Sequence, residues 1–305
     1  MSAPKPISSI LDTAGATPVV ELQRIAEGSG RRIFAKCELF GPTQSHKDRS
    51  VRTIMDRAKQ SGELKPGQPV IEASTGSFGI ALAQWCAVNG HPLTVILPER
   101  ASLERRETLK LYGAKFELVA HPRAALQRLQ ALQKDVPEAF LPMQLANEVA
   151  IDGYREGFGT ELVEQIQAAG GRIDAFVATA STGALIAGTK LALKAAFPEA
   201  IVWGVEPDQT FDVGMGVGLR SAMSGEDAPL PPALAQNVRA WLQVTSAAAL
   251  EMKERLAREE GLLCGISSGF NVVAALGLSD LPEDAHVWTV LPDTGERYFS
   301  LESLR

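Results

Sequence analysis

The sequence predicts an α/β protein built from two open, parallel-sheet α/β units. Short apolar segments that are typical of buried strands alternate with helical segments, as in parallel sheets with crossover helices. The alternation occurs twice, once toward each end of the chain. Hydrophobic residues make up 45% of the 305 residues, which is enough to build more than one core.

The first unit contains three expected strands and two expected helices. Strands are expected at 69–72, 93–97 and 115–119. The first helix is expected at 78–89, because this segment is apolar nearly all round and Gly90 follows as a stop signal. Ser102 is expected to cap the second helix, which runs to Tyr112 before Gly113.

The second unit repeats this order after a linking region near residues 143–154. Strands are expected at 175–178, 201–205 and 286–291. Helices are expected at 185–197, 246–260 and 268–278. The segment 208–243 is rich in Gly and Pro and predicts no particular element.

Charge and composition exclude several functional classes. The formal net charge of −6 argues against a general nucleic-acid-binding protein. No segment approaches the roughly 18 apolar residues of a membrane-spanning helix. The first 15 residues lack the pattern of a signal peptide. The cysteines and histidines are scattered, so we expect no disulfide framework and no metal site. A cytoplasmic protein is the expectation.

Three turns between expected strands and helices are rich in Gly, Ser and Thr. They lie at 73–79, 179–184 and 265–269. Such turns direct backbone N–H groups and the positive end of a helix at one point, where an anion binds. A single turn of this kind is most often only a capped turn. Three of them in one chain predict at least two anion sites.

Lys47 lies at the start of an expected helix, after a Gly- and Pro-containing turn. Two interpretations are open. In the first, Ser45 caps the helix and Lys47 is solvated. In the second, the helix N-terminus lowers the pKa of Lys47, as Schiff-base catalysis requires. The residues alone favour the first interpretation.

Two other enzyme motifs are disfavoured. Residues 265–269 match the G-x-S-x-G turn of α/β-hydrolases, but too little chain follows for the remaining strands and the catalytic histidine. Residues 214–218 do not match the G-x-G-x-x-G pattern of dinucleotide-binding folds.

Several segments in register resemble the cysteine synthase and cystathionine β-synthase family of fold-type II pyridoxal-phosphate enzymes. They are 42–49, 72–83, 104–118, 144–162, 202–207, 260–269 and 291–300. The resemblance implies a fold like that of the tryptophan synthase β-subunit. It implies a smaller, mobile domain of residues 41–150 and a larger, cofactor-holding domain of residues 1–40 and 151–305.

The resemblance also implies a role for each matching residue. Lys47 is expected to form the internal aldimine with pyridoxal 5'-phosphate and to shuttle the α-proton. Ser77 is expected near the ring oxygen of the cofactor and Ser267 at its ring nitrogen. The cofactor phosphate is expected against Ser181, Thr182, Gly183, Ala184 and Leu185. The substrate is expected against Ser74, Thr75, Gly76, Phe78 and Gln144.

Four of these positions depart from the family pattern. The family usually has Asn and Thr where this chain has Ser77 and Phe78, and Gly and Thr where it has Ala184 and Leu185. We predict that Ser77 and Phe78 set substrate specificity rather than cofactor affinity. Alternatively, Phe78 only packs within its helix, and specificity comes from the Gly-rich segment 211–219.

The resemblance implies a transferase that carries out β-replacement on an O-activated serine-type amino acid through an aminoacrylate. Sulfide or an amine is the expected nucleophile, and a homodimer is the expected assembly. Two alternatives stay open. One is a lyase or dehydratase that uses the same elimination step. The other is a non-catalytic relative that binds pyridoxal phosphate or a partner protein.

Overall fold

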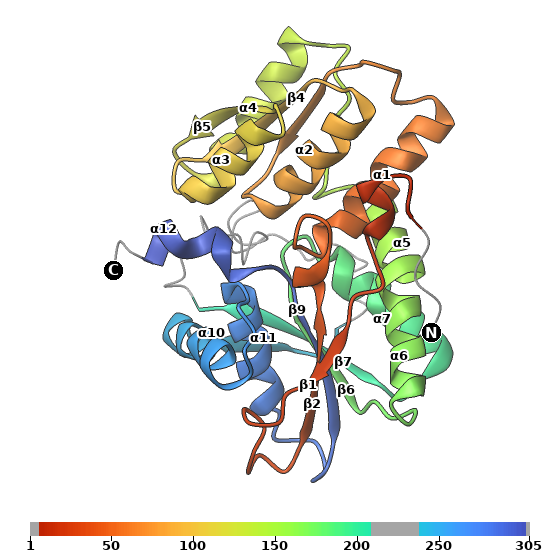
Figure 1. Cartoon of the computed structure of the whole chain (residues 1–305), viewed down its shortest axis with the longest axis vertical. Coiled ribbons are helices and arrows are strands. Elements are labelled where there is room, and N and C mark those ends of the chain that lie inside the picture. The colour runs from red at the N-terminus through yellow and green to blue at the C-terminus, as the bar shows by residue number, and fades with distance from the viewer. Residues whose placement is uncertain (1–5, 209–237, 303–305) are drawn as a thin grey trace.

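The computed structural model describes residues 6–208 and 238–302, which form two sheets with their covering helices (Figure 1). The segment 211–219, the alternative specificity determinant, lies outside the described residues. No helix within the described ranges is long and apolar enough to cross a membrane.

The larger sheet has six strands in the order β1-β2-β9-β6-β7-β8. Their bounds are Val19–Glu21 (β1), Arg32–Cys37 (β2), Ala175–Thr179 (β6), Ile201–Pro207 (β7), Trp241–Val244 (β8) and His286–Leu291 (β9). All neighbouring pairs are parallel except β1 and β2, which pair antiparallel at one edge. The predicted parallel α/β class is therefore confirmed, with one antiparallel edge strand added.

Helices cover both faces of this sheet. Helices α10 (Ser246–Glu259) and α11 (Ile266–Leu276) pack on one face, and α7 (Ala184–Ala196) packs on the other. The strand residues alternate between the two cores, as the two-residue period of a strand requires. Ala175 and Val177 join the core with α10 and α11, whereas Phe176 and Ala178 join the core with α7.

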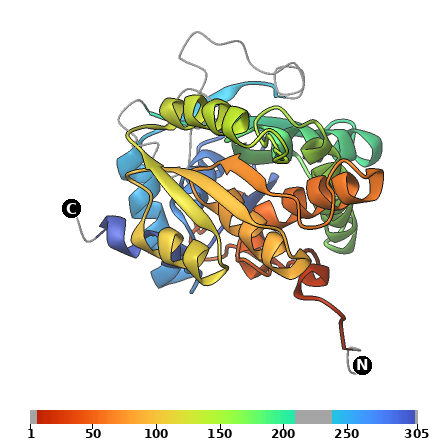
Figure 2. The same ribbon diagram turned by 90° about the horizontal axis from the view of Figure 1, so that it is seen from above.

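The smaller sheet lies above the larger one in Figure 1 and is seen from above in Figure 2. Its parallel strands are Val70–Ala73 (β3), Leu93–Pro98 (β4) and Lys115–Val119 (β5), in that order. Its helices are Ser77–Asn89 (α2), Leu103–Leu111 (α3) and Pro122–Asp135 (α4). Val70 and Val95 face the core that contains α2, whereas Ile71 and Ile96 face α4.

The two sheets share one continuous core. Helix α1 (Lys47–Ser61) packs against α2 and against α5 (Val149–Gly153), so it joins the two units. After α5 the chain continues through the π-helical segment η3 (Tyr154–Gly159) into α6 (Thr160–Ala168). The 3-10 segments are η1 (Ile10–Thr13), η2 (Glu38–Phe40) and η5 (Gly295–Tyr298). The last helix, α12 (Phe299–Glu302), lies at the junction of the units (Figure 1).

Two departures from the expected elements have physical explanations. Strand β2 is absent from the sequence prediction because charged residues, Arg32 and Lys36, interrupt its apolar pattern. The helix expected at 268–278 begins two residues earlier, at Ile266, with Gly265 as its N-cap. Ser267 therefore lies in the first turn of α11, where the helix N-terminus is positive.

Candidate active site

A cavity lies between the two sheets, where strands of both end and helices begin. This is the usual position of a ligand site in an open α/β protein. Most of the predicted site residues line it: Lys47, Ser74, Thr75, Ser77, Phe78, Gln144, Ser181, Thr182, Gly183, Leu185 and Ser267. Gly76 and Ala184 are next to lining residues but do not themselves line the cavity.

Lys47 is the first residue of α1 and is only 7% exposed. Its Nζ donates a hydrogen bond to Ser181 Oγ at 3.4 Å. Burial lowers the pKa of Lys47 to about 8. The solvated-lysine interpretation is therefore wrong. The lowered pKa has burial as its cause, whereas the sequence argument attributed it to the helix N-terminus.

The start of α7 places two hydroxyl groups and a helix N-terminus at the cavity. Gly183 precedes the helix in a left-handed conformation with φ 86°, which turns the chain into it. The Thr182 N–H donates to Ser181 Oγ at 2.7 Å, and the Ala184 N–H donates to Thr182 Oγ1 at 3.4 Å. Hydroxyl groups and the positive end of a 13-residue helix suit a dianionic phosphate.

The loop before α2 is held by its own serine. Ser74 Oγ accepts hydrogen bonds from the N–H groups of Gly76 and Gly79, at 3.1 and 3.0 Å, and the Ser74 N–H donates to Ile96 O. Two of the N–H groups expected to bind a carboxylate are thus used within the protein. The amides of Thr75 and Ser77 are the ones that this loop leaves for a ligand.

Gly76 allows a close approach to α3. Its φ is +153°, and a Cβ at this position would overlap the side chain of Arg105. Arg105 is 1% exposed, lines the cavity and lies with its guanidinium 4.7 Å from the ring centre of Tyr298. A buried cation therefore lies directly beside the loop that carries Thr75 and Ser77.

Gln144 is fixed against the same loop by a buried carboxyl group. Its backbone N–H donates to Glu72 Oε2 at 3.1 Å, and its side-chain Nε2 donates to Ala73 O at 2.8 Å. Burial raises the pKa of Glu72 to about 7. The amide oxygen of Gln144 is the atom that these bonds leave for a ligand.

The two substituted positions of the loop behave differently. Phe78 is 2% exposed and belongs to the core shared by the two sheets, yet it also lines the cavity. The Ser77 hydroxyl donates to Asp293 Oδ2 at 3.0 Å. Phe78 therefore both packs in the core and borders the cavity, so the packing and specificity interpretations of this residue do not exclude each other.

The cavity lining also includes three residues that were not predicted as site residues, namely Asp293, Arg105 and Tyr298. A charged residue in a helical or turn segment is most often solvated, so sequence reasoning passes over Arg105 and Asp293. One available signal is the position of Asp293 directly after a strand, at the carboxyl edge of the sheet. Further lining residues that were not predicted are Ser45, His46, Thr179, Ile186, Val290 and Pro292.

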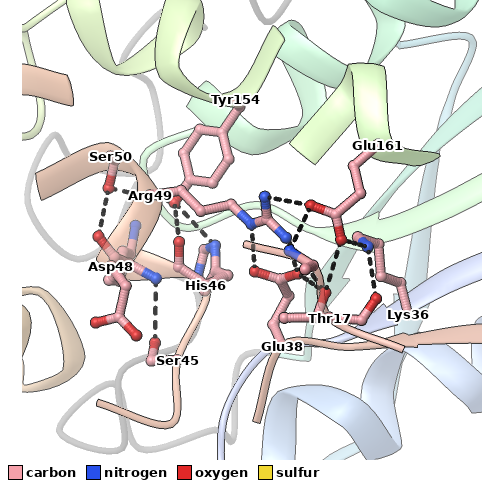
Figure 3. Close-up of polar contacts among 12 residues, drawn as sticks. Thr17, Lys36, Glu38, Ser45, His46, Asp48, Arg49, Ser50, Tyr154 and Glu161 are labelled. Atoms are coloured by element: carbon pink, nitrogen blue, oxygen red, sulfur yellow. Dashed lines mark hydrogen bonds and ion pairs between the residues drawn. The ribbon is translucent and has the colours of Figure 1, made fainter. Parts of the chain in front are cut away.

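A buried ion cluster supports the start of α1 (Figure 3). Arg49 donates to both carboxylate oxygens of Glu38, at 2.7 and 2.9 Å, and to Glu161 at 2.9 Å. Lys36 has a fully buried side chain and donates to Glu161 at 2.6 Å. Two cations and two carboxylates are thereby paired, which buried charges require. The cluster ties α1 to β2 and α6 and so fixes the position of Lys47.

The described residues contain no group of His, Cys, Asp or Glu side chains that could hold a metal ion. The cavity instead combines a buried amine, a phosphate-type donor set and a polar loop. These groups fit a phosphate-bearing aldehyde cofactor: Lys47 would supply the amine that reacts with the aldehyde, and the N-terminus of α7 would hold the phosphate.

Comparisons with known proteins agree with this chemistry. The family model "Pyridoxal-phosphate dependent enzyme" matches residues 10–293. A cysteine synthase from Staphylococcus aureus is 34% identical over 306 residues, covering 98% of this chain and 97% of that protein. O-ureido-L-serine synthase has a similar structure, with TM-score 0.86, 31% identity, and coverage of 99% of this chain and 97% of that one. A hydrogen sulfide-producing enzyme from Fusobacterium nucleatum gives TM-score 0.88 at 27% identity, covering 96% and 100%.

These matches extend over nearly the whole chain, so the expected cofactor, pyridoxal 5'-phosphate, and the enzymatic rather than non-catalytic interpretation are confirmed. The fold-type II architecture is confirmed by the same comparisons. The chain belongs to the pyridoxal-phosphate dependent enzymes and, within them, to the cysteine synthase and cystathionine β-synthase family.

Proposed function

We propose that this enzyme carries out β-replacement on an O-activated serine-type amino acid, with a small nucleophile such as sulfide or an amine. The observation that carries the proposal is the buried Lys47 amine, whose pKa of about 8 keeps a useful neutral fraction near neutral pH. The similarity to a cysteine synthase over 98% of the chain supports the same reaction class.

The cofactor-binding roles are proposed residue by residue. The hydroxyls of Ser181 and Thr182 and the amides of Gly183 and Leu185 at the start of α7 bind the phosphate, while the Ala184 N–H holds Thr182 Oγ1. Ser267, in the first turn of α11, faces the ring nitrogen. When bound, the cofactor withdraws electrons from the α-carbon of the amino acid. Because serine is neutral, it does not force the ring nitrogen to be protonated. An unprotonated ring suits a short elimination step.

Substrate binding is assigned to the loop before α2 and to Gln144. The amides of Thr75 and Ser77 bind the α-carboxylate, while Ser74 and Gly76 hold the loop in shape. Lys47 removes the proton from the α-carbon, which allows the β-oxygen substituent to leave. Phe78 contributes an apolar wall beside the substituent.

β-Elimination is a second candidate for the overall reaction. It is supported by the structural similarity to a hydrogen sulfide-producing enzyme. The two reactions share the departure of the β-substituent and differ in whether a nucleophile or water acts afterwards.

A product analysis with the holoenzyme separates these candidates. Purified enzyme is mixed with O-acetylserine, O-phosphoserine, serine or cysteine, with and without sulfide or an amine, and the products are identified by mass spectrometry. A new β-substituted amino acid supports replacement, and a 2-oxo acid with ammonia supports elimination. If no substrate is converted and the cofactor absorption does not change, the proposed function is wrong. Lys47→Ala is the control and is expected to convert nothing.

We also propose that the enzyme is a cytoplasmic homodimer. Cys37, Cys86 and Cys264 are buried free thiols, which supports a reducing compartment. Leu103 and Phe299 are 60% and 51% exposed on the neighbouring elements α3 and α12, which supports an apolar subunit contact. Light scattering is expected to give twice the 32.6 kDa chain mass, and cell fractionation tests the compartment.

A further inference from the structure

Residues 292–294, which follow β9, contact three of the segments that the proposed function uses. Pro292 O accepts a hydrogen bond from the backbone N–H of His46, the residue before the proposed catalytic lysine, at 2.9 Å. Asp293 O accepts from the Gly265 N–H at 2.8 Å, at the start of α11. The backbone of this short segment therefore joins the lysine segment to the segment that carries the serine proposed to face the cofactor ring.

The Asp293 side chain extends this connection to the smaller sheet. Asp293 is 4% exposed, and its Oδ2 accepts hydrogen bonds from Ser77 Oγ at 3.0 Å and from the Tyr298 hydroxyl at 2.9 Å. Its Oδ1 is buried and has no hydrogen-bond partner among the residues that the structure describes. A Cβ at Gly265 would overlap Oδ1, so the absence of a side chain there makes room for the carboxylate.

Of the two donors to Asp293, only Ser77 comes from the smaller unit. Tyr298 belongs to η5, close to Asp293 in the chain, and its ring centre lies 4.7 Å from the Arg105 guanidinium and 5.9 Å from the Lys253 ammonium. The Tyr298 bond therefore holds the carboxylate in place, whereas the Ser77 bond connects that carboxylate to the loop before α2.

We propose that Asp293 is a positioning residue that acts through the Ser77 hydroxyl to set the carboxylate-binding loop, residues 74–77, relative to Lys47. The inference rests on the proposed function, because it assumes that this loop binds the amino-acid substrate. The single hydroxyl proton of Ser77 is donated to Asp293, so in this state Ser77 does not also donate to the cofactor ring oxygen. Loss of this bond would displace the loop, and even a small displacement of a positioned group strongly reduces its contribution to amino-acid binding.

The test is a double-mutant cycle in the holoenzyme, with Ser77→Ala, Asp293→Asn and the two combined. Ser77→Ala is expected to raise the KM for the O-activated serine about tenfold, with a smaller change in kcat, because its hydrogen bond to a charged group is lost. Asp293→Asn is expected to raise KM in the same direction but less, because an amide oxygen still accepts the bond without the negative charge. The combined variant is expected to match Ser77→Ala, because both changes act on the same bond. Ser77→Asn retains a donor and is expected to raise KM less than Ser77→Ala does.

Tyr298→Phe is the matched control. It removes the other donor to the same carboxylate oxygen but leaves the ring beside both cations, so KM is expected to change less than in Ser77→Ala. Effects of Ser77→Ala and Asp293→Asn that simply multiply would overturn the proposal. So would a loss of cofactor affinity with an unchanged KM.

A second measurement is independent of turnover. Amide hydrogen exchange of residues 74–79 in the substrate-free holoenzyme is expected to rise in Ser77→Ala and, to a smaller extent, in Asp293→Asn. Unchanged exchange overturns the positioning role even if the enzyme is active. Faster exchange in an enzyme that converts no O-activated serine retains the positioning role and rejects only the proposed substrate.

Discussion

At the scale of single residues, Lys47 illustrates how burial changes the chemistry of a side chain. The sequence places it at a helix start, where an ammonium group is mildly disfavoured. In the tertiary structure only 7% of Lys47 is exposed, and it borders a cavity that the ends of β6 and β9 also line. Burial is the larger effect, and it lowers the pKa from its usual value near 10.5 to about 8.

This lowered pKa predicts a pH-dependent stability cost in the cofactor-free protein. Below pH 8 the folded state must hold a charged, buried lysine, and the difference in pKa corresponds to about 3 kcal/mol. The cost disappears as the pH rises from about 8 to 10.5, because both states then lose the proton. Lys47→Met is therefore expected to be relatively more stable at pH 7 than at pH 10.5, by about 3 kcal/mol in denaturant titrations. Lys59→Met, an exposed lysine of the same helix, is the control; equal pH dependence in the two variants contradicts the prediction.

Phe78 is expected to contribute to both stability and substrate preference. Phe78→Thr, alone or with Ser77→Asn, removes a buried ring and is expected to lower the free energy of unfolding by about 3 kcal/mol. The Phe78→Thr change is also expected to raise activity with O-acetylserine and sulfide relative to activity with the enzyme's own amino acid and nucleophile. Ile80→Ala is a matched control, because Ile80 lies in the same helix and core but does not line the site cavity. A shift in preference that Ile80→Ala reproduces would make Phe78 a packing residue only.

At the scale of elements, the buried ion cluster determines how α1 lies against β2 and α6. Burial raises the pKa of Glu161, but the hydrogen bonds and charges of Arg49 and Lys36 outweigh burial. They hold this pKa below its usual value near 4.5. The carboxylate therefore contributes stability above pH 4.5, and this contribution is lost as the pH falls through the lowered pKa.

Glu161→Gln is expected to destabilise the protein by about 3 kcal/mol at pH 7, because it leaves buried cations without their full countercharge. The difference from wild type is expected to shrink below pH 4.5. Thermal and denaturant unfolding measure both effects. Glu156→Gln is the comparison, because Glu156 pairs with Arg57 at the surface and is expected to cost less than about 1 kcal/mol. A similar loss in both variants would mean that the cluster has no special role.

At the scale of the whole molecule, the smaller unit contacts the C-terminal segment through a few side chains beside the cavity. Besides the Ser77–Asp293 bond, Ser300 donates to Glu104, with its Oγ at 2.7 Å from Oε2. Helix α12 and α3 meet at this junction (Figure 1). Mobility of the smaller domain stays a prediction, because α1 and the shared apolar core also join the two units.

Closure of the smaller unit over the amino acid is expected to slow amide exchange in the loop 74–77 and in α3. The holoenzyme is compared with and without a saturating O-activated serine by hydrogen-exchange mass spectrometry. Strand β9 lies inside the larger sheet and is expected to remain unchanged. Uniform protection of both units, or none, would contradict relative motion of the smaller domain.

The sequence by itself determined the α/β class, most of the strands and helices, and the segments that form the cavity. Local signals suffice for these features: the Ser102 cap is confirmed by a hydrogen bond from the Arg105 N–H, and the strand expected at 115–119 has those bounds. The family resemblance added the cofactor, because several short motifs in register are far more specific than any one of them.

Only the tertiary structure decided the partners of charged residues. Strand β2 was missed because Lys36 looks like a surface residue until its carboxylate partner, Glu161, comes from 125 positions away. Arg105 and Asp293 were missed for the same reason, since each becomes part of the cavity through contacts with distant segments. Burial and charge pairing depend on which segments meet in space, and periodicity within one segment carries no information about that.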